Sequence, residues 1–424
     1  MICERSVKDS DRYDSLHCDD AKKYGTVGRL RAKHNFNAVR EETILKKTYR
    51  TLALTAGALV ATGAHAQSSV QLYGLFDMSA IAYTTNANAA GNHLISMGHP
   101  GDTGGEPWFS GSRWGMRGAE DIGGGNKIIF TLESEFVGTS GMAEDGSQLF
   151  DRDAWVGLQN DTIGKVTVGF QDTVAKDFSG LYGDPYTSSQ FSTKEGAYTN
   201  SNNFKQLVFY AAGPTGTRST NSIAWKKLWH NGIYAAADYQ FSNSTQFATG
   251  SGYQLALGFN GPSFSVGGFY DHTNNAGFID QTYSVGGNYR FGIGKINAGY
   301  FHYTGKQGSL PDREDNAWTV SFKLAPHGPM DYELGYQQMH VKNAAYNADG
   351  NIPNANSGLF DPAGTTVHNG YKETLYASTF YHLSKRTELY LAADYMKLHG
   401  GYTVANTFGH SNQLEVATGI RTRF

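Results

Sequence analysis

The sequence predicts an all-β fold, a transmembrane antiparallel β-barrel, and two observations support this prediction. Of the 424 residues, 52 are glycine and 13% are aromatic, whereas only 10 are proline and 17% are charged, a composition typical of folded β-structure rather than disorder. Apolar and polar residues also alternate along stretches of about ten residues, which is the two-residue period of a strand. A mean hydropathy of −0.45 excludes a protein built from several membrane-spanning helices.

An export signal precedes the predicted barrel. Residues 46–50 form a basic block, residues 52–60 a short apolar block, and residues 64–66 (Ala-His-Ala) a cleavage site of small residues. In this order the three parts are typical of a signal peptide over 45–66 that is cleaved after Ala66. Residues 1–44 are mixed in charge and precede the basic block, so we expect them to be a disordered, overextended start. Residues 67–424 are the predicted barrel domain.

Sixteen strands are expected in residues 67–424, joined by alternately long and short connections. Turn residues such as Gly123-Gly124-Gly125 mark the short connections, and the longest connection covers about 175–216. The apolar segment 207–210 within it resembles a strand, but an even strand number favours a loop. The predicted strands are 70–84, 108–119, 125–137, 150–159, 165–174, 217–227, 232–242, 251–260, 264–271, 280–291, 295–304, 316–324, 330–341, 371–382, 387–397 and 412–424.

The last strand shows the alternation most clearly. Leu414, Val416 and Ile420 share one face, and Glu415 and Arg421 share the other. A soluble sandwich and a membrane barrel both fit this pattern, since each has one apolar and one polar face. Predicted export, aromatic residues at strand ends and the alternating connections favour the membrane barrel. Sixteen strands enclose a water-filled channel, so the predicted size implies a pore.

Other function classes are disfavoured by what the predicted barrel domain lacks. Both cysteines, Cys3 and Cys18, lie in the leader, so no disulfide or thiolate metal site is expected. The barrel domain holds 23 basic and 30 acidic residues, which argues against a nucleic-acid partner. Without metal-binding histidine spacing, a phosphate loop or a nucleophile elbow, we expect no metal, no cofactor and no catalytic residues. Glu133 and Glu135 share an inward face and are interpreted as lumen lining.

Four stretches resemble the Gram-negative general porins, most closely those of the beta-proteobacteria. They are residues 70–77 (VQLYGLFD), 112–125 (SRWGMRGAEDIGGG), 381–390 (YHLSKRTELY) and 419–424 (GIRTRF). The resemblance covers all of 67–424 and implies a homotrimer of sixteen-stranded barrels in the lipid of a Gram-negative outer membrane. It also implies a water-filled channel for passive diffusion of ions and small hydrophilic solutes, with a long third external loop folded into the lumen.

The same resemblance implies a charged constriction and an assembly signal. Alternation turns the wall arginines inward, where they avoid a cost of about 2–4 kcal/mol for facing lipid at the mid-bilayer. Terminal Phe424 matches the family's membrane insertion and assembly signal. The arginines that match the basic wall are Arg113, Arg117, Arg152 and Arg218. The acidic residues expected from the loop are Asp177, Asp184 and Glu195.

The sequence departs from the family pattern in two places, one that bears on subunit contacts and one in the constriction loop. Phe170 stands where relatives often have an arginine that supports subunit contacts, and the loop lacks a Pro-Glu-Phe-Gly pattern. Trp155 is expected on the face opposite Arg152.

The alternative on the same scaffold is a substrate-specific outer-membrane channel, which is disfavoured because few aromatic residues fall on inward positions. An outer-membrane barrel enzyme and a soluble secreted β-domain are further hypotheses that the sequence leaves open.

Overall fold

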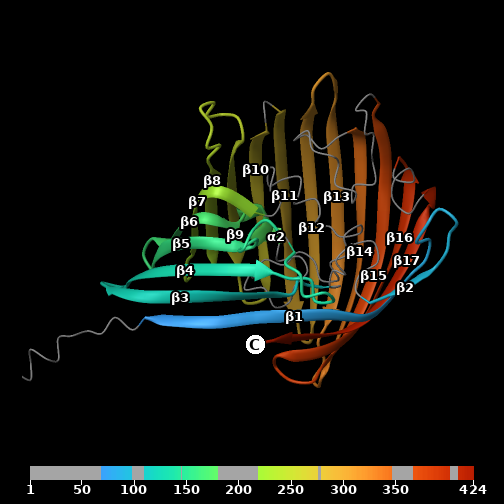
Figure 1. The fold of residues 1–424 in the computed structure, drawn as a ribbon, viewed down its shortest axis with the longest axis horizontal. Coiled ribbons are helices and arrows are strands. Elements are labelled where there is room, and N and C mark those ends of the chain that lie inside the picture. The colour runs from blue at the N-terminus through green and yellow to red at the C-terminus, as the bar shows by residue number, and fades with distance from the viewer. Residues whose placement is uncertain are drawn as a thin grey trace, which may run out of the picture. The chain divides into compact units, whose positions relative to one another are not determined.

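The protein folds into a closed antiparallel barrel (Figure 1). The structure is a computed structural model that describes residues 68–97, 109–144, 146–179, 218–275, 278–345, 366–401 and 409–424. The sheet closes because β1 pairs with β17 on one side and with β3 on the other. The three-residue strand β2 (Leu94–Ser96) pairs with the end of β1. The sixteen wall strands are β1 (Ser69–Thr84), β3 (Arg113–Gly123), β4 (Asn126–Glu135), β5 (Asp153–Asn160), β6 (Gly164–Asp172), β7 (Arg218–Leu228), β8 (Ile233–Gln240), β9 (Ser251–Asn260), β10 (Phe264–Asn275), β11 (Phe278–Phe291), β12 (Gly294–Gln307), β13 (Leu310–Leu324), β14 (Met330–Ala344), β15 (His368–His382), β16 (Thr387–Gly400) and β17 (Asn412–Arg423).

All sixteen predicted strands are present, but the predicted loops 272–279 and 305–315 are wrong in length, since the strands on both sides extend into them. β10 and β11 stay paired as far as Asn275 and Phe278, and β12 and β13 as far as Gln307 and Leu310. The hairpins therefore extend further than the predicted strands, because backbone pairing continues through polar segments such as 272–275 and 312–315 that interrupt the apolar alternation. The leader and the segment 207–210 lie outside the described residues.

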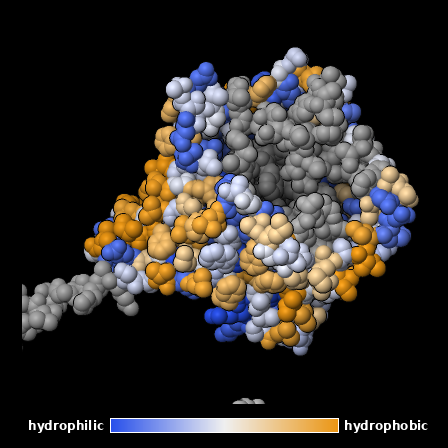
Figure 2. Space-filling model, viewed as in Figure 1, coloured by the Kyte–Doolittle hydropathy of each residue, from blue (hydrophilic) through white to orange (hydrophobic). Residues whose placement is uncertain are grey.

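Alternation along the strands sorts side chains between two environments. On β9, Leu255 and Leu257 are exposed on the outer side, whereas Gln254 and Ala256 are buried on the inner side. Figure 2 shows hydrophobic residues gathered on the outside of the wall. A soluble sandwich would bury its apolar face, so this arrangement excludes that hypothesis. An apolar exterior around a polar interior is the arrangement of a barrel surrounded by lipid.

The closing strand pair joins the two ends of the barrel domain. Gly74 and Phe424 exchange two backbone hydrogen bonds, of 3.2 and 3.1 Å. The ring of Phe424 covers Gly74 so closely that a Cβ atom added there would lie 2.2 Å from the ring. Only glycine therefore leaves room at this position for the terminal ring.

An ionic and aromatic cluster stabilises this closure from the inner side. Arg421 of β17 is fully buried, and its Nε lies 2.5 Å from Glu388 Oε1 of β16. The guanidinium group also packs over the rings of Phe109 and Phe380, at 5.2 and 5.5 Å from the ring centroids. These contacts link β15, β16 and β17 to the segment that enters β3.

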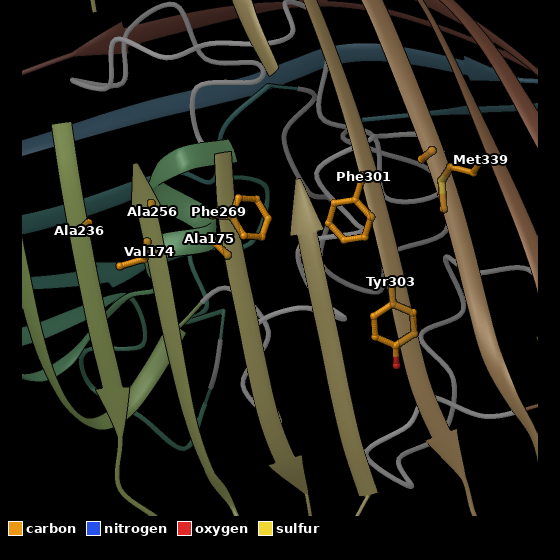
Figure 3. Close-up of a cluster of buried hydrophobic side chains, with 9 residues drawn as sticks. Val174, Ala175, Ala236, Ala256, Phe269, Phe301, Tyr303 and Met339 are labelled. Carbon is orange, nitrogen blue, oxygen red and sulfur yellow. The ribbon is translucent and has the colours of Figure 1, made fainter. Parts of the chain in front are cut away.

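A short helix, α2 (Val174–Ser179), follows β6 and packs against the inner wall. The Val174 N–H donates to Asp238 Oδ2 of β8 at 2.9 Å, and the Ala175 N–H donates to Gln254 Oε1 of β9 at 2.7 Å. Both helix residues join an apolar cluster that includes Phe269 (Figure 3). The sequence does not predict α2, since six residues are too few to show helical periodicity.

No helix among the described residues is long and apolar enough to cross a membrane.

Replacing Gly74 with leucine tests the closure. The new side chain would overlap the Phe424 ring, and we expect a loss of about 1–3 kcal/mol of stability. The measurement is the urea midpoint for loss of the folded, heat-modifiable band in gels. Gly146→Leu is the control, because no atom lies within 4 Å of a Cβ added there. Equal midpoints for the two variants would contradict this account of the closure.

Candidate pore constriction

Two arginines meet two glutamates on the inner wall. Arg152, just before β5, places Nε at 2.6 Å from Glu133 Oε1, and its Nη1 contacts Glu135 Oε2. Arg113, the first residue of β3, places Nε at 3.8 Å from the same Glu133 oxygen. Tyr73 of β1 donates its hydroxyl hydrogen to Glu133 Oε2 at 2.8 Å. Glu133 is therefore the centre of this group.

A second group adjoins the first and includes the start of α2. Arg218, the first residue of β7, places Nε at 2.8 Å from Asp172 Oδ1 and donates to the carbonyl oxygen of Arg152 at 2.6 Å. Lys176 of α2 places Nζ at 2.7 Å from the same Asp172 oxygen. Residues from both sides of the long third connection are thus joined to the wall. We call these two groups together the basic wall cluster.

Hairpin register brings the first group together. The turn Gly123-Gly124-Gly125 has positive φ at each residue, a conformation that favours glycine. A bulge between Asp121 and Gly123 then shifts the register, which places Arg113 opposite Glu135, and Gly115 opposite both Glu133 and Tyr73. A Cβ atom on Gly115 would come within 3.0 Å of the Tyr73 ring. The glycine therefore leaves the space in which Tyr73 reaches Glu133.

The cluster shifts the pKa values of two cations that lie outside the strands, Arg152 and Lys176. Burial disfavours the charged form of Arg152, but the carboxylates of Glu135 and Glu133 outweigh this effect and raise its pKa above the usual value. Burial and the nearby positive charge of Arg218 lower the pKa of Lys176 to about 7, although Asp172 opposes the shift. Arg152 is therefore a permanent charge, whereas Lys176 titrates near neutral pH.

The structure pairs three of the four predicted wall arginines with wall carboxylates, whereas Arg117 contacts Gln71 and the ring of Tyr73. Arg117 is exposed, donates to Gln71 Oε1 at 2.8 and 3.0 Å, and packs over the Tyr73 ring. It lies four residues from Arg113, or about 13 Å along an extended strand. Among the predicted loop acids, Asp177 lies in α2, whereas Asp184 and Glu195 lie outside the described residues.

The immediate partners of these arginines are wall carboxylates, which the sequence pattern does not predict. The pattern places Glu133 and Glu135 only in the lumen lining, and nothing in it distinguishes Lys176. The inward alternation of β3 and β4 indicates that Arg113 and Glu135 both face the lumen, but a bulge between Asp121 and Gly123 sets the register that pairs them, and the sequence pattern does not predict this bulge. The contacts of Arg152, Arg218 and Lys176 carry no comparable local signal, because loops separate these residues from their partners.

The predicted orientation of Trp155 is wrong. Its indole N–H donates to Asp153 Oδ1 at 3.0 Å, and Lys165 Nζ lies 4.9 Å from the ring centroid. The neighbouring Val156 is exposed on the outer side. Trp155 therefore shares the luminal side with Arg152, because Arg152 precedes the strand and does not follow its alternation.

Within the part of the chain that the structure describes, no three His, Cys, Asp or Glu side chains are grouped to hold a metal ion.

Comparison with known proteins decides the family. A model described as Gram-negative porin matches residues 53–401. The chain belongs to the Gram-negative porin family. It is 30% identical over 288 residues to an outer membrane porin protein of Bordetella pertussis, and the match covers 61% of this chain and 70% of the relative. This porin therefore resides in the outer membrane of a Gram-negative bacterium, where it forms a water-filled diffusion channel.

Solved structures share the fold of this porin. The anion-selective porin from Comamonas acidovorans matches with a TM-score of 0.63 and 22% identity, over 84% of this chain and all of that one. A trimer form of OmpT, an outer membrane protein of Vibrio cholerae, matches with a TM-score of 0.57 and 13% identity, over 84% of this chain and 99% of that one. Both comparisons support the sixteen-stranded barrel.

Replacing Glu133 with glutamine should weaken the cluster and change the pore. We expect a stability loss of about 1–3 kcal/mol, because a charged hydrogen-bond acceptor of Arg152 and Tyr73 is lost. Removal of a luminal negative charge should also shift the reversal potential in a salt gradient toward anions. Glu120→Gln, at an exposed position on the same hairpin, is the control. Unchanged urea midpoint and reversal potential in Glu133→Gln would contradict this assignment.

The titration of Lys176 predicts a pH dependence. Below about pH 7 the ammonium group is charged and favours anions in the lumen, so anion preference should fall as the pH rises from 5.5 to 8.5. Because the pKa of Lys176 in the folded protein lies below that of free lysine, the unfolded state binds more protons between about pH 7 and 10. The free energy of unfolding should therefore increase as the pH rises through this range. Reversal potentials at several pH values measure the first effect. Lys176→Met should abolish the step, whereas Lys385→Met, in an exposed turn, should retain it.

Proposed function

We propose that the basic wall cluster forms one side of the pore constriction, and that the porin is a passive channel with a preference for small anions. The observation that supports this most is the meeting of Arg113, Arg152 and Arg218 from separate elements on the luminal face. The related Comamonas porin is anion-selective, which agrees with this preference. Transport needs no catalytic step in this mechanism.

Electrostatics explains how such a cluster would act on solutes. Glu133, Glu135 and Asp172 hold the guanidinium groups in place and offset much of their charge. Arg113 lies 3.8 Å from the Glu133 carboxylate and keeps 18% of its side chain exposed, so it is the arginine of the cluster that is most available to a passing anion. A fixed charge in a narrow, partly desolvated lumen acts more strongly than in bulk water.

The opposite side of the constriction is proposed to come from the third external loop. Asp177, Asp184 and Glu195 would face the arginines and create a transverse field that orients dipolar solutes. The attachment of α2 to β8 and β9 supports an inward path for the start of this loop. Arg117 would then act as a lumen charge nearer the short turns.

Export and assembly complete the proposal. The signal peptide would be removed near Ala66, and Phe424 would serve as the signal for membrane insertion. The fit of Phe424 over Gly74 supports a role in closing the barrel as well. A homotrimer is supported by the trimer form of the structurally similar OmpT.

One observation favours a substrate-specific channel as the second candidate. Trp155 faces the lumen with Lys165 over its ring, so an aromatic surface and a cation occur together near the cluster. A solute with a planar group and a negative charge would suit this pair. Saturation of the current by such a solute, and loss of saturation in Trp155→Ala, would favour this candidate.

Single-channel recording in a salt gradient tests the main proposal. Native protein should insert as groups of three conductance steps and show an anion-favouring reversal potential. Arg113→Ala and Arg152→Ala should each shift that potential toward cations, and Arg117→Ala should shift it less. Arg386→Ala, in an exposed turn at the barrel end, is the control.

Two results would contradict the proposal. A folded trimer without conductance steps would overturn the open diffusion channel. A reversal potential that is equal in the native protein and in both arginine variants would remove the basic wall cluster from the constriction.

A further inference from the structure

The segment that enters β3 lies on the inner side of the barrel wall. Residues 109–112 lead into this strand, and the buried ring of Phe109 lies 4.9 Å from the ring centroid of Phe380 in β15 and 4.8 Å from that of Tyr390 in β16. Tyr390 points to the lumen, since its neighbour Leu389 is exposed on the outer surface and successive side chains of a strand alternate. We call residues 109–112 the luminal strap.

A buried carboxylate of β1 holds the first half of the luminal strap. The Ser110 N–H donates to Asp77 Oδ2 at 3.0 Å, and the Tyr390 hydroxyl donates to Asp77 Oδ1, also at 3.0 Å. Arg421 of β17 donates from Nη1 to the Ser110 hydroxyl oxygen at 3.3 Å. Both oxygens of the Asp77 carboxylate are thus hydrogen-bonded, and these contacts fix the strap to β1, β16 and β17.

Ser112 fixes the second half of the strap because it continues the pairing of β1. The ladder between β1 and β3 ends at the pair Leu75 and Arg113. Beyond this pair, the Ser112 hydroxyl donates to the Asp77 carbonyl oxygen at 3.0 Å and accepts from the Asp77 N–H at 3.1 Å. One side chain of the strap therefore satisfies both backbone groups of Asp77 in place of a strand partner.

Between these two anchors, Gly111 lies directly against the basic wall cluster. A Cβ atom added to Gly111 would overlap the Glu135 carboxylate, which also contacts Nη1 of Arg152. The Gly111 carbonyl oxygen accepts from Nη1 of Arg113 at 3.5 Å. The φ angle of Gly111 is not positive, so the close approach of Glu135, and not the backbone conformation, requires a glycine at this position.

The backbone of Glu135 is held in place on both sides. Its N–H donates to Asp151 Oδ1 at 2.7 Å, and its carbonyl oxygen accepts from the Glu144 N–H at 3.2 Å. A side chain at position 111 would therefore displace the Glu135 carboxylate, and Arg152 would lose one of the two glutamates that it contacts. An arginine that loses such a partner presents more positive charge to the lumen.

We propose that the luminal strap is a positioning element of the channel, which holds the Glu135 carboxylate beside Arg152 and so limits the positive charge that the basic wall cluster presents to solutes. This inference rests on the proposed function of that cluster. Gly111 leaves the space for the carboxylate, and the contacts of Phe109 and Asp77 keep the strap against the wall. An uncharged residue thereby adjusts the anion preference of the pore.

Reversal potentials of the purified native and variant proteins in a salt gradient test the proposal. Gly111→Ala should raise the anion-to-cation permeability ratio by about twofold, although it changes no charge. The same substitution in a Glu135→Gln background should add no further shift, because the displaced side chain is then neutral. Gly138→Ala is the matched control, since a Cβ atom added there makes only ordinary contacts of 3.4 and 3.5 Å, one of them with the Ser112 hydroxyl.

Phe109→Ala is a second variant that loosens the strap from the wall instead of crowding Glu135. It should raise the permeability ratio in the native background and leave it unchanged in the Glu135→Gln background. The heat-modifiable band in gels shows which variants are folded. If Gly111→Ala does not fold, Phe109→Ala decides the question.

An unchanged permeability ratio in folded Gly111→Ala overturns the proposal. An equal shift with and without Glu135→Gln overturns it as well, because the strap would then act on the pore without Glu135. Arg113→Ala and Arg152→Ala are recorded alongside, to separate this inference from the proposed function. A shift in these arginine variants without a shift in the strap variants removes the strap alone, whereas no shift in the arginine variants removes both.

Discussion

The need to pair every backbone N–H and C=O group inside an apolar layer is the constraint on which this structure depends. Neither lipid nor the apolar side chains can supply hydrogen bonds, so an open sheet edge is too costly and the sheet closes. Closure rests on the pairing of β1 with β17, where Phe424 covers Gly74 and the buried Arg421 pairs with Glu388. Residues more than 300 positions apart must therefore meet before the barrel is complete.

Closure also determines where charge can lie. A side chain on a wall strand points either to lipid or to the lumen, and charged groups at mid-membrane depth avoid lipid. The lumen therefore collects both signs of charge, and Arg113, Arg152 and Arg218 are paired with carboxylates. A buried ion pair adds little net stability, because desolvation offsets the attraction. Its effect here is to hold the guanidinium groups in fixed positions beside the path of the solute.

The outer surface follows from the same two-residue period. Where a strand crosses the apolar layer, its outward residues are Leu, Val and aromatic residues. Where β12–β16 leave this layer, outward positions become His, Asn, Tyr and Glu373. A single strand thus places side chains that line the lumen on one face and side chains that face lipid or the membrane interface on the other.

The sequence by itself determined the number of wall strands, their alternation and the inward direction of Arg113, because these features depend on neighbours one or two residues apart. The pairing of Arg113 with Glu135 depends on a bulge between Asp121 and Gly123, which the sequence pattern does not predict. Only the tertiary structure decided that Tyr73 meets Glu133, that Trp155 faces the lumen, that α2 lies on β8 and β9, and that polar residues of five strands form one patch. The physical reason is that such contacts depend on register summed across several strands and on chain segments without regular periodicity. A shift of one residue in any hairpin would move every later side chain to the opposite face.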